Sequence, residues 1–394
     1  MEDQAHTEAL AELVSASHIR RVEVCAWRDL EDPEAGGSEL HADRVATRWA
    51  AAGLDVELRT SMVPGAALQT DRNGYHVTRR GGRYEVFAQV LGEGLRRSAP
   101  RPDAVVDIWN GIPFFSPAWF RGPRLTVLHH VHGEMWRMAL GRNLGAIGDT
   151  IERNVAPLLY RSTPVATLSA SSREEIVERL HLPASHVHVV EPGIDTRFCP
   201  GGERSAIPLV VAVGRLVPVK RYDLLFRAMA EARRRVPGLR CVVVGEGYLR
   251  PGLEAARREL GADAWIELPG HVDDDELVEL YRSAWLVASA SLREGWGMTL
   301  TEAAACATPA VATDIAGHRD AVDAGRSGLL VADDALGDGI ARVLTDDALR
   351  ATLSSGALGS AARFDWGRTA SRLFALLDPD GALRASRGAP RGST

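Results

Sequence analysis

The stretch "PLVVAVGRLVPVKR", residues 208–221, decides the fold. Its apolar run has the length of a buried parallel strand, and a glycine and basic residues follow where such a strand would end. The next stretch, "YDLLFRAMAEARRRV" (222–236), spaces its apolar residues at helical intervals. A strand, a polar turn and a helix in this order predict a βα unit of a parallel-sheet protein.

The same alternation of strand and helix extends through both halves of the chain. In the second half, further apolar runs predict strands at 241–247, 264–270, 285–291, 309–313 and 328–331. In the first half they lie at 21–27, 55–60, 104–109, 125–130, 164–169 and 187–193. Between the halves, "FCPGGERSAIP" (198–208) has the Pro and Gly content of a linker. We therefore expect an α/β protein with two facing Rossmann-like, doubly wound parallel-sheet domains, an interdomain cleft, and ligands at the carboxyl ends of the strands.

Composition excludes several classes of protein. The chain has 394 residues, of which 45 % are hydrophobic and 25 % charged, as in globular enzymes of two or more domains. A net charge of -6 argues against a nucleic-acid partner. The 4 cysteines form no C-x-x-C pair, so neither a zinc site nor a disulfide framework is expected. The N-terminal residues lack the apolar core of a signal peptide and no apolar run would span a bilayer, so we expect a cytoplasmic protein.

Two turns carry residues suited to an anion. In "EAGGSEL" (34–40), Gly36 and Gly37 precede a helix whose first N–H groups would favour an anion, with Ser38 expected as the N-cap. A plain βα turn explains two glycines equally well. In the stretch 208–221, Arg215 and Lys220 follow the end of the predicted strand. A guanidinium and an ammonium suit a diphosphate, although either residue taken singly could be a solvated surface cation.

A third turn, "REGWGMTLTE" (293–302), adds carboxylates. The backbone amides at the start of its predicted helix, ready for phosphate oxygens, are those of Met298, Thr299 and Leu300. Glu294 and Glu302 flank this helix start, and carboxylates accept hydrogen bonds from sugar hydroxyls. The alternative is one capping glutamate and one buried glutamate paired with a cation. Together with the two basic residues, the turn favours a nucleoside diphosphate sugar as ligand.

With these motifs in this order, the sequence resembles the retaining glycosyltransferases of family 4, which have the GT-B fold. The resemblance covers about Val22 to Leu377 and also rests on "EAAACATPAVA" (302–312). It implies that Glu294 binds the donor sugar and Glu302 the ribose. It further implies a diphosphate site made by Arg215, Lys220, Gly36 and Gly37, with the glycine turn closing over the diphosphate from the other domain. Ala307 stands where the family usually has glycine, which we interpret as a packing change.

The resemblance also divides the chain into parts. Residues 1–198 are expected to form the acceptor-side domain and residues 199–362 the nucleotide-sugar-binding domain. Residues 363–379 are expected to form a helix that returns to the first domain. The remaining residues, 380–394, end in "ASRGAPRGST" and are expected to be disordered.

The stretch "LHHVHGEMW" (128–136) contains three histidines after a predicted strand. Adjacent strand residues point to opposite faces and no acidic cluster accompanies them, which argues against a metal site. The family carries a histidine near the donor sugar here. His129 matches it best by position, with His132 as the alternative. The run "HVDDDELVEL" (271–280) contains D-x-D, but an N-cap aspartate explains it, so no metal is expected. By the family's pattern, the main chain at His271 and Val272 contacts the base.

The acceptor is poorly specified by the sequence. The aromatic stretch 106–120 and the residues around Trp136 suggest either a stacking site for the acceptor or a membrane-surface face, whereas buried core explains them equally well. The candidate acceptor residues are Trp109, Asn110, His132 and Trp136. A small molecule, a glycan or a lipid-linked acceptor would fit, the last with peripheral membrane contact.

The resulting prediction is a retaining glycosyltransferase that uses a nucleoside diphosphate sugar as co-substrate and needs no other cofactor. His129, Glu294, Arg215 and Lys220 are the predicted catalytic residues. Retention often uses a carboxylate nucleophile, but the resemblance implies front-face displacement, in which the departing phosphate oxygen takes the acceptor proton. Two alternatives remain open. One is a nucleotide-sugar epimerase of the same fold, and the other is a noncatalytic nucleotide-sugar-binding protein.

Overall fold

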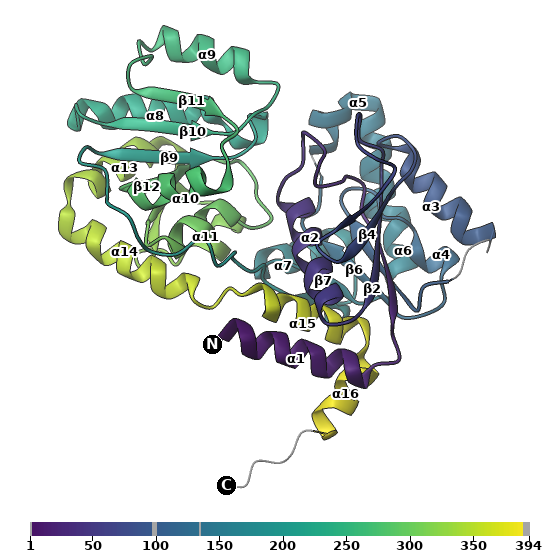
Figure 1. Ribbon diagram of the computed structural model, residues 1–394. Coiled ribbons are helices and arrows are strands. Elements are labelled where there is room, and N and C mark those ends of the chain that lie inside the picture. The colour runs from purple at the N-terminus through teal and green to yellow at the C-terminus, as the bar shows by residue number, and fades with distance from the viewer. Residues whose placement is uncertain (1, 97–100, 134, 389–394) are drawn as a thin grey trace. The chain divides into compact units, whose positions relative to one another are not determined.

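The computed structural model describes residues 2–96, 101–133 and 135–388 (Figure 1). The chain forms two compact units, of which the first comprises Met1–Gly193 with Asp365–Thr394 and the second Ile194–Phe364. The domain boundaries expected at residues 198/199 and 362/363 lie close to these limits. Each unit is built on its own sheet.

The second unit contains six parallel strands in the order β11-β10-β9-β12-β13-β14. Their bounds are β9 (Leu209–Val213), β10 (Arg240–Val244), β11 (Ile266–Gly270), β12 (Leu286–Ser289), β13 (Ala310–Thr313) and β14 (Gly328–Val331). The order reverses beside β9, as in doubly wound sheets, whose ligands bind beyond the carboxyl ends of the strands. The turns after β9 and β12 therefore open on the same edge of the sheet, and these turns carry most of the predicted site residues.

Helices connect the strands of the second unit. They are α8 (Tyr222–Arg235), α9 (Arg250–Glu259), α10 (Asp274–Ser283), α11 (Met298–Ala305), α12 (Ala316–Ala321), α13 (Leu336–Thr345) and α14 (Asp347–Ala361), with short 3-10 turns η3 (Pro218–Lys220) and η4 (Asp333–Ala335). The helical spacing in 222–236 buries one face of α8, including Leu225, Phe226 and Met229, in the core of the unit. Asp273 caps α10 by accepting the N–H of Glu276 at 2.8 Å, as expected for the D-x-D run.

The first unit contains eight strands in the order β3-β4-β2-β1-β5-β6-β7-β8, parallel except for the β3–β4 pair. Their bounds are β1 (Arg21–Cys25), β2 (Asp55–Thr60), β3 (Gln69–Arg72), β4 (Tyr75–Arg79), β5 (Ala104–Trp109), β6 (Arg124–Leu128), β7 (Val165–Thr167) and β8 (Val187–Val189). The β3–β4 hairpin was not predicted, because its strands are rich in polar residues. Its two-residue turn, Asn73 and Gly74, has positive φ at both positions.

The helices of the first unit include both ends of the described chain. They are α1 (Glu2–Ala16), α2 (Gly37–Ala51), α3 (Glu85–Arg96), α4 (Ser116–Trp119), α5 (Met135–Thr150), α6 (Ala156–Tyr160), α7 (Ala170–Leu180), α15 (Trp366–Leu377) and α16 (Pro379–Gly388), with the π-helical turn η1 (Ile151–Val155) and the 3-10 turn η2 (Ala184–His186). Helices α1 and α15 lie side by side (Figure 1). Helix α15 buries Leu373 and Phe374 in the same core as β1 and α2.

Three local expectations were wrong. Ser38 is inside α2, whose N-cap is Gly36. The segment expected to be disordered from residue 380 is helical as far as Gly388, while residues 389–394 lie outside the described residues. Ala307 is not a packing change but a backbone one: its φ is +56°, a left-handed conformation that favours glycine.

Candidate functional site

Lys220 and Glu294 meet at the carboxyl edge of the second unit's sheet. Lys220 ends η3 after β9, and Glu294 lies in the loop after β12. The Lys220 Nζ is 2.5 Å from Glu294 Oε1, and the two side chains are 21 % and 20 % exposed. The structure thus contains the cation–carboxylate pair that was one of the two sequence interpretations of this turn. It also brings together two residues that the sequence assigned to the same ligand.

Neighbouring polar groups hold Glu294 in its charged form. Ser291 Oγ donates to Glu294 Oε1 at 2.7 Å. Burial raises the pKa of Glu294, but the charge and hydrogen bond of Lys220 outweigh burial, so the pKa lies below its ordinary value. Glu294 is therefore ionised at neutral pH and can accept further hydrogen bonds.

His318 and Gly317, which the sequence analysis did not identify, support this carboxylate. Burial lowers the pKa of His318, although Glu294 opposes the shift. Its Nδ1 lies 2.7 Å from the carbonyl of Thr313, so that nitrogen carries the proton and donates. A Cβ on Gly317 would lie 2.3 Å from the Glu294 carbonyl oxygen, so only glycine fits there. Both follow β13, and a Gly-His pair after a strand was the available signal.

Arg221 is a second residue that the sequence analysis did not assign to the site. It has φ +49° and directs its side chain back to the end of β12. Its Nε donates to the Ala290 carbonyl at 2.7 Å, its Nη2 donates to the Ser291 carbonyl at 3.1 Å, and it pairs with Asp333. Arg221 therefore fixes the loop that carries Ser291 and Glu294. Spacing alone gave no reason to separate it from Lys220.

The other residues of the second unit that were predicted to bind the nucleotide sugar follow strands of the same sheet. Arg215 is exposed at the end of β9, and Glu302 accepts the hydroxyl of the buried Tyr281 at 3.2 Å. Helix α11 begins at Met298 after the N-cap Gly297, and its first N–H bond inside the helix is that of Leu300 to Gly297. The amides of Met298 and Thr299 thus precede the helical ladder. His271 is exposed and Val272 is buried.

In the first unit, the glycine turn is held by a buried carboxylate. Gly36 N–H donates to Glu39 Oε2 at 2.8 Å, and the other oxygen of Glu39 accepts from Arg28 Nε at 3.2 Å. Glu39 and Arg28 are both 4 % exposed. Because the Gly36 N–H is already bonded, an anion at this helix terminus would meet the amides from Gly37 onward.

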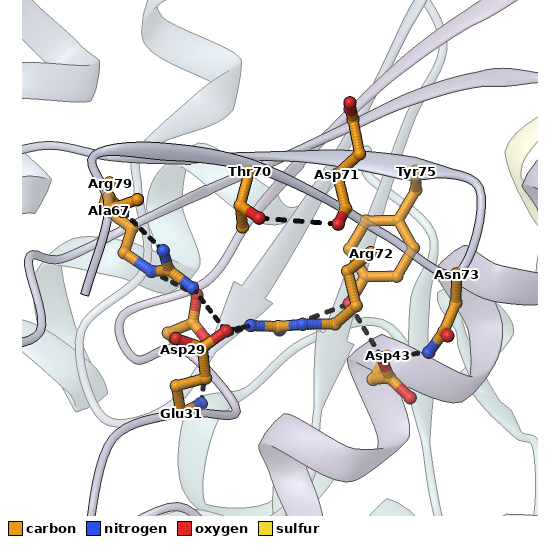
Figure 2. Close-up of polar contacts among 10 residues, drawn as sticks. All are labelled: Asp29, Glu31, Asp43, Ala67, Thr70, Asp71, Arg72, Asn73, Tyr75 and Arg79. Carbon is orange, nitrogen blue, oxygen red and sulfur yellow. Dashed lines mark hydrogen bonds and ion pairs between the residues drawn. The ribbon is translucent and has the colours of Figure 1, made fainter.

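A charged network anchors the loop that leads to this turn (Figure 2). Arg72 and Arg79 of the β3–β4 hairpin both point toward Asp29, which is fully buried. Arg79 Nε and Arg72 Nη2 each donate to Asp29 at 2.8 Å, and the Glu31 N–H donates at 2.7 Å. Burial raises the pKa of Asp29, but these three donors outweigh it and the pKa lies below its ordinary value. The unpredicted hairpin therefore fixes the loop between β1 and α2.

His129 lies just beyond β6 and is 5 % exposed. Burial lowers the pKa of His129 to about 4, so its imidazole is neutral at pH 7. His130 and His132 stack on each other with ring centroids 4.9 Å apart. The three histidines therefore separate into one buried ring and one stacked pair.

Glu152, on η1, organises the loop after the histidines and was missed by the sequence analysis. Its carboxylate accepts the N–H groups of His132 and Gly133 at 2.9 and 3.2 Å and the Trp136 Nε1–H at 2.9 Å. Burial raises the pKa of Glu152 to about 7 despite these donors. No sequence signal identified it, because its partners lie about twenty residues away along the chain.

Most aromatic residues predicted near the acceptor belong to the core. Trp109 is 0 % exposed and packs on Tyr160, so the acceptor contact predicted for Trp109 is wrong. Trp136 is 6 % exposed and is held by Glu152. Asn110 is half-buried and its Nδ2 donates to Ser38 at 3.4 Å. Core packing is thus the correct interpretation of Trp109, while Asn110 and His132 keep partial exposure.

Comparisons with known proteins agree on one family. A profile described as Glycosyl transferases group 1 matches residues 200–358, and one described as Glycosyltransferase Family 4 matches residues 35–198. The chain is 35 % identical to a D-inositol 3-phosphate glycosyltransferase of Nocardia farcinica, over 91 % of this chain and 89 % of that protein. It is 33 % identical to the corresponding protein of Salinispora arenicola, over 86 % of each.

Solved structures share the fold at lower identity. The sucrose-phosphate synthase of Thermosynechococcus elongatus has a TM-score of 0.77 and 19 % identity, covering 92 % of this chain and 100 % of that one. HepE of Anabaena, solved in complex with UDP and glucose, has a TM-score of 0.68 and 18 % identity, covering 90 % and 98 %. These likenesses confirm the predicted two-domain Rossmann-like fold.

Proposed function

Since the chain belongs to the family 4 glycosyltransferases and is an enzyme of that group, we propose that it transfers a sugar from a nucleoside diphosphate sugar to an acceptor hydroxyl with retention of configuration. The observation that carries this proposal is the Lys220–Glu294 pair, whose carboxylate lies in the segment that leads into α11. One ligand with a diphosphate and a sugar would engage the Lys220 ammonium, the Glu294 carboxylate and the first amides of α11.

The proposed roles follow from charge. Lys220 and Arg215 would neutralise the leaving diphosphate in place of a metal, and the amides of α11, from Met298 to Leu300, would bind its oxygens. Glu294 would accept sugar hydroxyls and Glu302 those of the ribose. In the reaction, the bond from the anomeric carbon to the phosphate oxygen breaks as the acceptor oxygen attacks from the same face. The departing phosphate oxygen takes the acceptor proton.

The first unit would contribute the remaining contacts. Gly37 would offer its amide to the donor phosphates, with Gly36 shaping the turn, and His129 would hydrogen-bond a hydroxyl of the donor sugar. His271 and Val272 would meet the base through their main chain. Asn110, His132 and the Trp136 region would face the acceptor.

The decisive experiment is product analysis with a panel of nucleoside diphosphate sugars. Relatives named for D-inositol 3-phosphate and a fold neighbour solved with UDP make UDP-sugars and inositol 3-phosphate the first pair to test. We expect release of nucleoside diphosphate and a glycoside whose anomeric configuration matches the donor. An epimerised nucleotide sugar formed without acceptor would instead establish the epimerase, and tight binding without turnover would establish a binding protein.

We also propose that the first unit contacts an anionic membrane surface through α5, η1 and α6. Among the described residues, no helix is long and apolar enough to cross a membrane. However, large apolar side chains that are 41–65 % exposed gather on these three helices: Met138, Leu144, Ile147, Val155, Leu158 and Leu159. Exposed arginines accompany them at 137, 142, 153 and 161. Exposed apolar side chains accompanied by exposed arginines fit a surface of anionic lipid.

The membrane proposal predicts co-sedimentation with vesicles that contain phosphatidylglycerol and much weaker binding to pure phosphatidylcholine. The variant Leu144→Glu/Leu158→Glu should bind at least about tenfold more weakly, because each buried leucine contributes roughly 1.5 kcal/mol or more. Leu68→Glu, at a residue 60 % exposed elsewhere in the same unit, is the control and should bind normally. Equal vesicle binding by the double variant and the wild type would refute the proposal. If the wild type is a dimer in solution and the double variant a monomer, the face would instead be assigned to contact with a second copy of the chain.

A further inference from the structure

His41 lies directly behind His129. It is on α2, is 2 % exposed, and meets the His129 ring edge-on, with ring centroids 5.1 Å apart and an interplanar angle of 90°. Edge-to-face contact is a preferred geometry for a pair of rings. The His129 imidazole is therefore packed against a residue some ninety positions earlier in the chain.

The His129 ring keeps hydrogen-bonding capacity that the described residues do not use. Both of its ring nitrogens are enclosed without a hydrogen-bond partner among those residues, and so is Nε2 of His41. A buried polar atom left unsatisfied costs roughly 1–3 kcal/mol, and such atoms in native proteins call for an explanation. A ligand hydroxyl would satisfy His129, since a neutral imidazole offers one donor and one acceptor.

Trp366 holds the other side of His41. Its ring lies 5.5 Å from the His41 ring at 66° and is 1 % exposed. Trp366 is the first residue of α15, whose N-cap Asp365 accepts the Arg368 N–H at 2.7 Å. A Cβ on Gly193 would lie 2.2 Å from the Trp366 backbone nitrogen, so the start of α15 packs directly on that glycine. His41 is thus packed between two rings in the buried core of the unit.

The same helix also connects His129 to the glycine turn. Glu39, two residues before His41 on α2, accepts the Gly36 N–H, and its charge opposes the burial that lowers the pKa of His129. A shift of α2 would therefore displace the glycine turn and the support of His129 together.

We propose that His41 is a positioning residue: clamped by Trp366, it holds the His129 ring in the orientation in which its nitrogens meet the donor sugar. The inference rests on the proposed function, because it takes His129 as a sugar-binding residue. His41 itself is not expected to touch the substrate.

The test compares His41→Ala with His41→Phe, which keeps a flat ring. His41→Ala should lower kcat roughly 10- to 100-fold, the cost of a misplaced catalytic group, while the Kd for the nucleoside diphosphate alone stays unchanged. His41→Phe should recover kcat to within about threefold. Val45→Ala, a buried truncation one turn further along α2, is the matched control for general loss of packing and should keep kcat.

A second readout does not depend on turnover. Water entering beside the truncated residue should raise the pKa of His129 from about 4 toward the ordinary 6.5, measured by NMR titration of its ring, and the acid limb of the kcat profile should move up with it. Unchanged kcat and unchanged His129 pKa in His41→Ala would overturn the inference. Full activity of His129→Ala would instead remove the sugar-binding role of His129 and leave the geometry of the ring pair intact.

Discussion

Lys220→Ala should lower kcat for sugar transfer by roughly 10²- to 10³-fold, because removing one preorganised donor from a developing anion costs about that much. It should also weaken nucleoside diphosphate binding. Glu294→Ala should lower kcat to a similar extent but leave the Kd for the nucleoside diphosphate nearly unchanged, because its proposed partner is the sugar. Steady-state kinetics and calorimetric titration with the nucleoside diphosphate measure the two effects separately.

The ion pair itself could be purely structural, and a neutral double variant separates that possibility. Lys220→Met/Glu294→Gln removes both charges together and leaves neither partner uncompensated, which avoids the cost of breaking a pair from one side. If the pair only holds the loop, this variant should regain activity. If both groups bind the donor, it should remain as inactive as the worse single variant. Arg227→Ala, which removes an exposed cation on α8, should change neither kcat nor the Kd for the nucleoside diphosphate.

Asp29→Ala should lower the free energy of unfolding of the first unit by about 3 kcal/mol, since it leaves a buried arginine without its main partner. Arg79 is 1 % exposed and Arg72 13 %, so water cannot replace the carboxylate well. For a unit of this size, that loss corresponds to a fall in Tm of roughly 6–12 °C. Calorimetry or chemical denaturation would measure it.

The pH dependence of the same interaction has a defined sign. The pKa of Asp29 is lower in the folded chain than its ordinary 3.8, so its contribution is complete above pH 3.8 and is lost as the pH falls through the folded value. The stability difference between wild type and Asp29→Ala should therefore shrink in acid. Asp71→Ala removes an exposed carboxylate from the same hairpin and should cost less than about 0.5 kcal/mol. Equal melting of Asp29→Ala and Asp71→Ala would contradict the buried network.

The strands were predictable because buried parallel strands are apolar on both faces. The apolar runs at 104–109 and 328–331 match β5 and β14 residue for residue, and the alternating stretch at 55–60 matches β2. The β3–β4 hairpin departs from this rule because it is an antiparallel edge whose side chains carry charges into a buried network. Its only sequence signal was the pair Asn73 and Gly74, which favours a two-residue hairpin turn.

The residues of the candidate site likewise fall into those that chain order predicts and those that it does not. Residues that follow strand ends, such as Lys220 and Glu294, could be named because parallel strands end at one edge of a sheet. Their direct pairing could not, because 74 positions separate them. Arg221 and Glu152 act through side-chain directions and burial, which no local spacing reports, whereas His318 had only the Gly-His pair after β13 as a signal.

By itself the sequence determined the α/β class, the strands of both sheets apart from one hairpin, and the residue types gathered at the edge beyond β9 and β12, because these depend on periodicity and chain order. Only the tertiary structure decided which charges are paired, which aromatics are core, and that His129 is a buried neutral ring packed against His41. Those properties depend on distance and on the exclusion of water, and both are set by contacts between residues far apart in the chain.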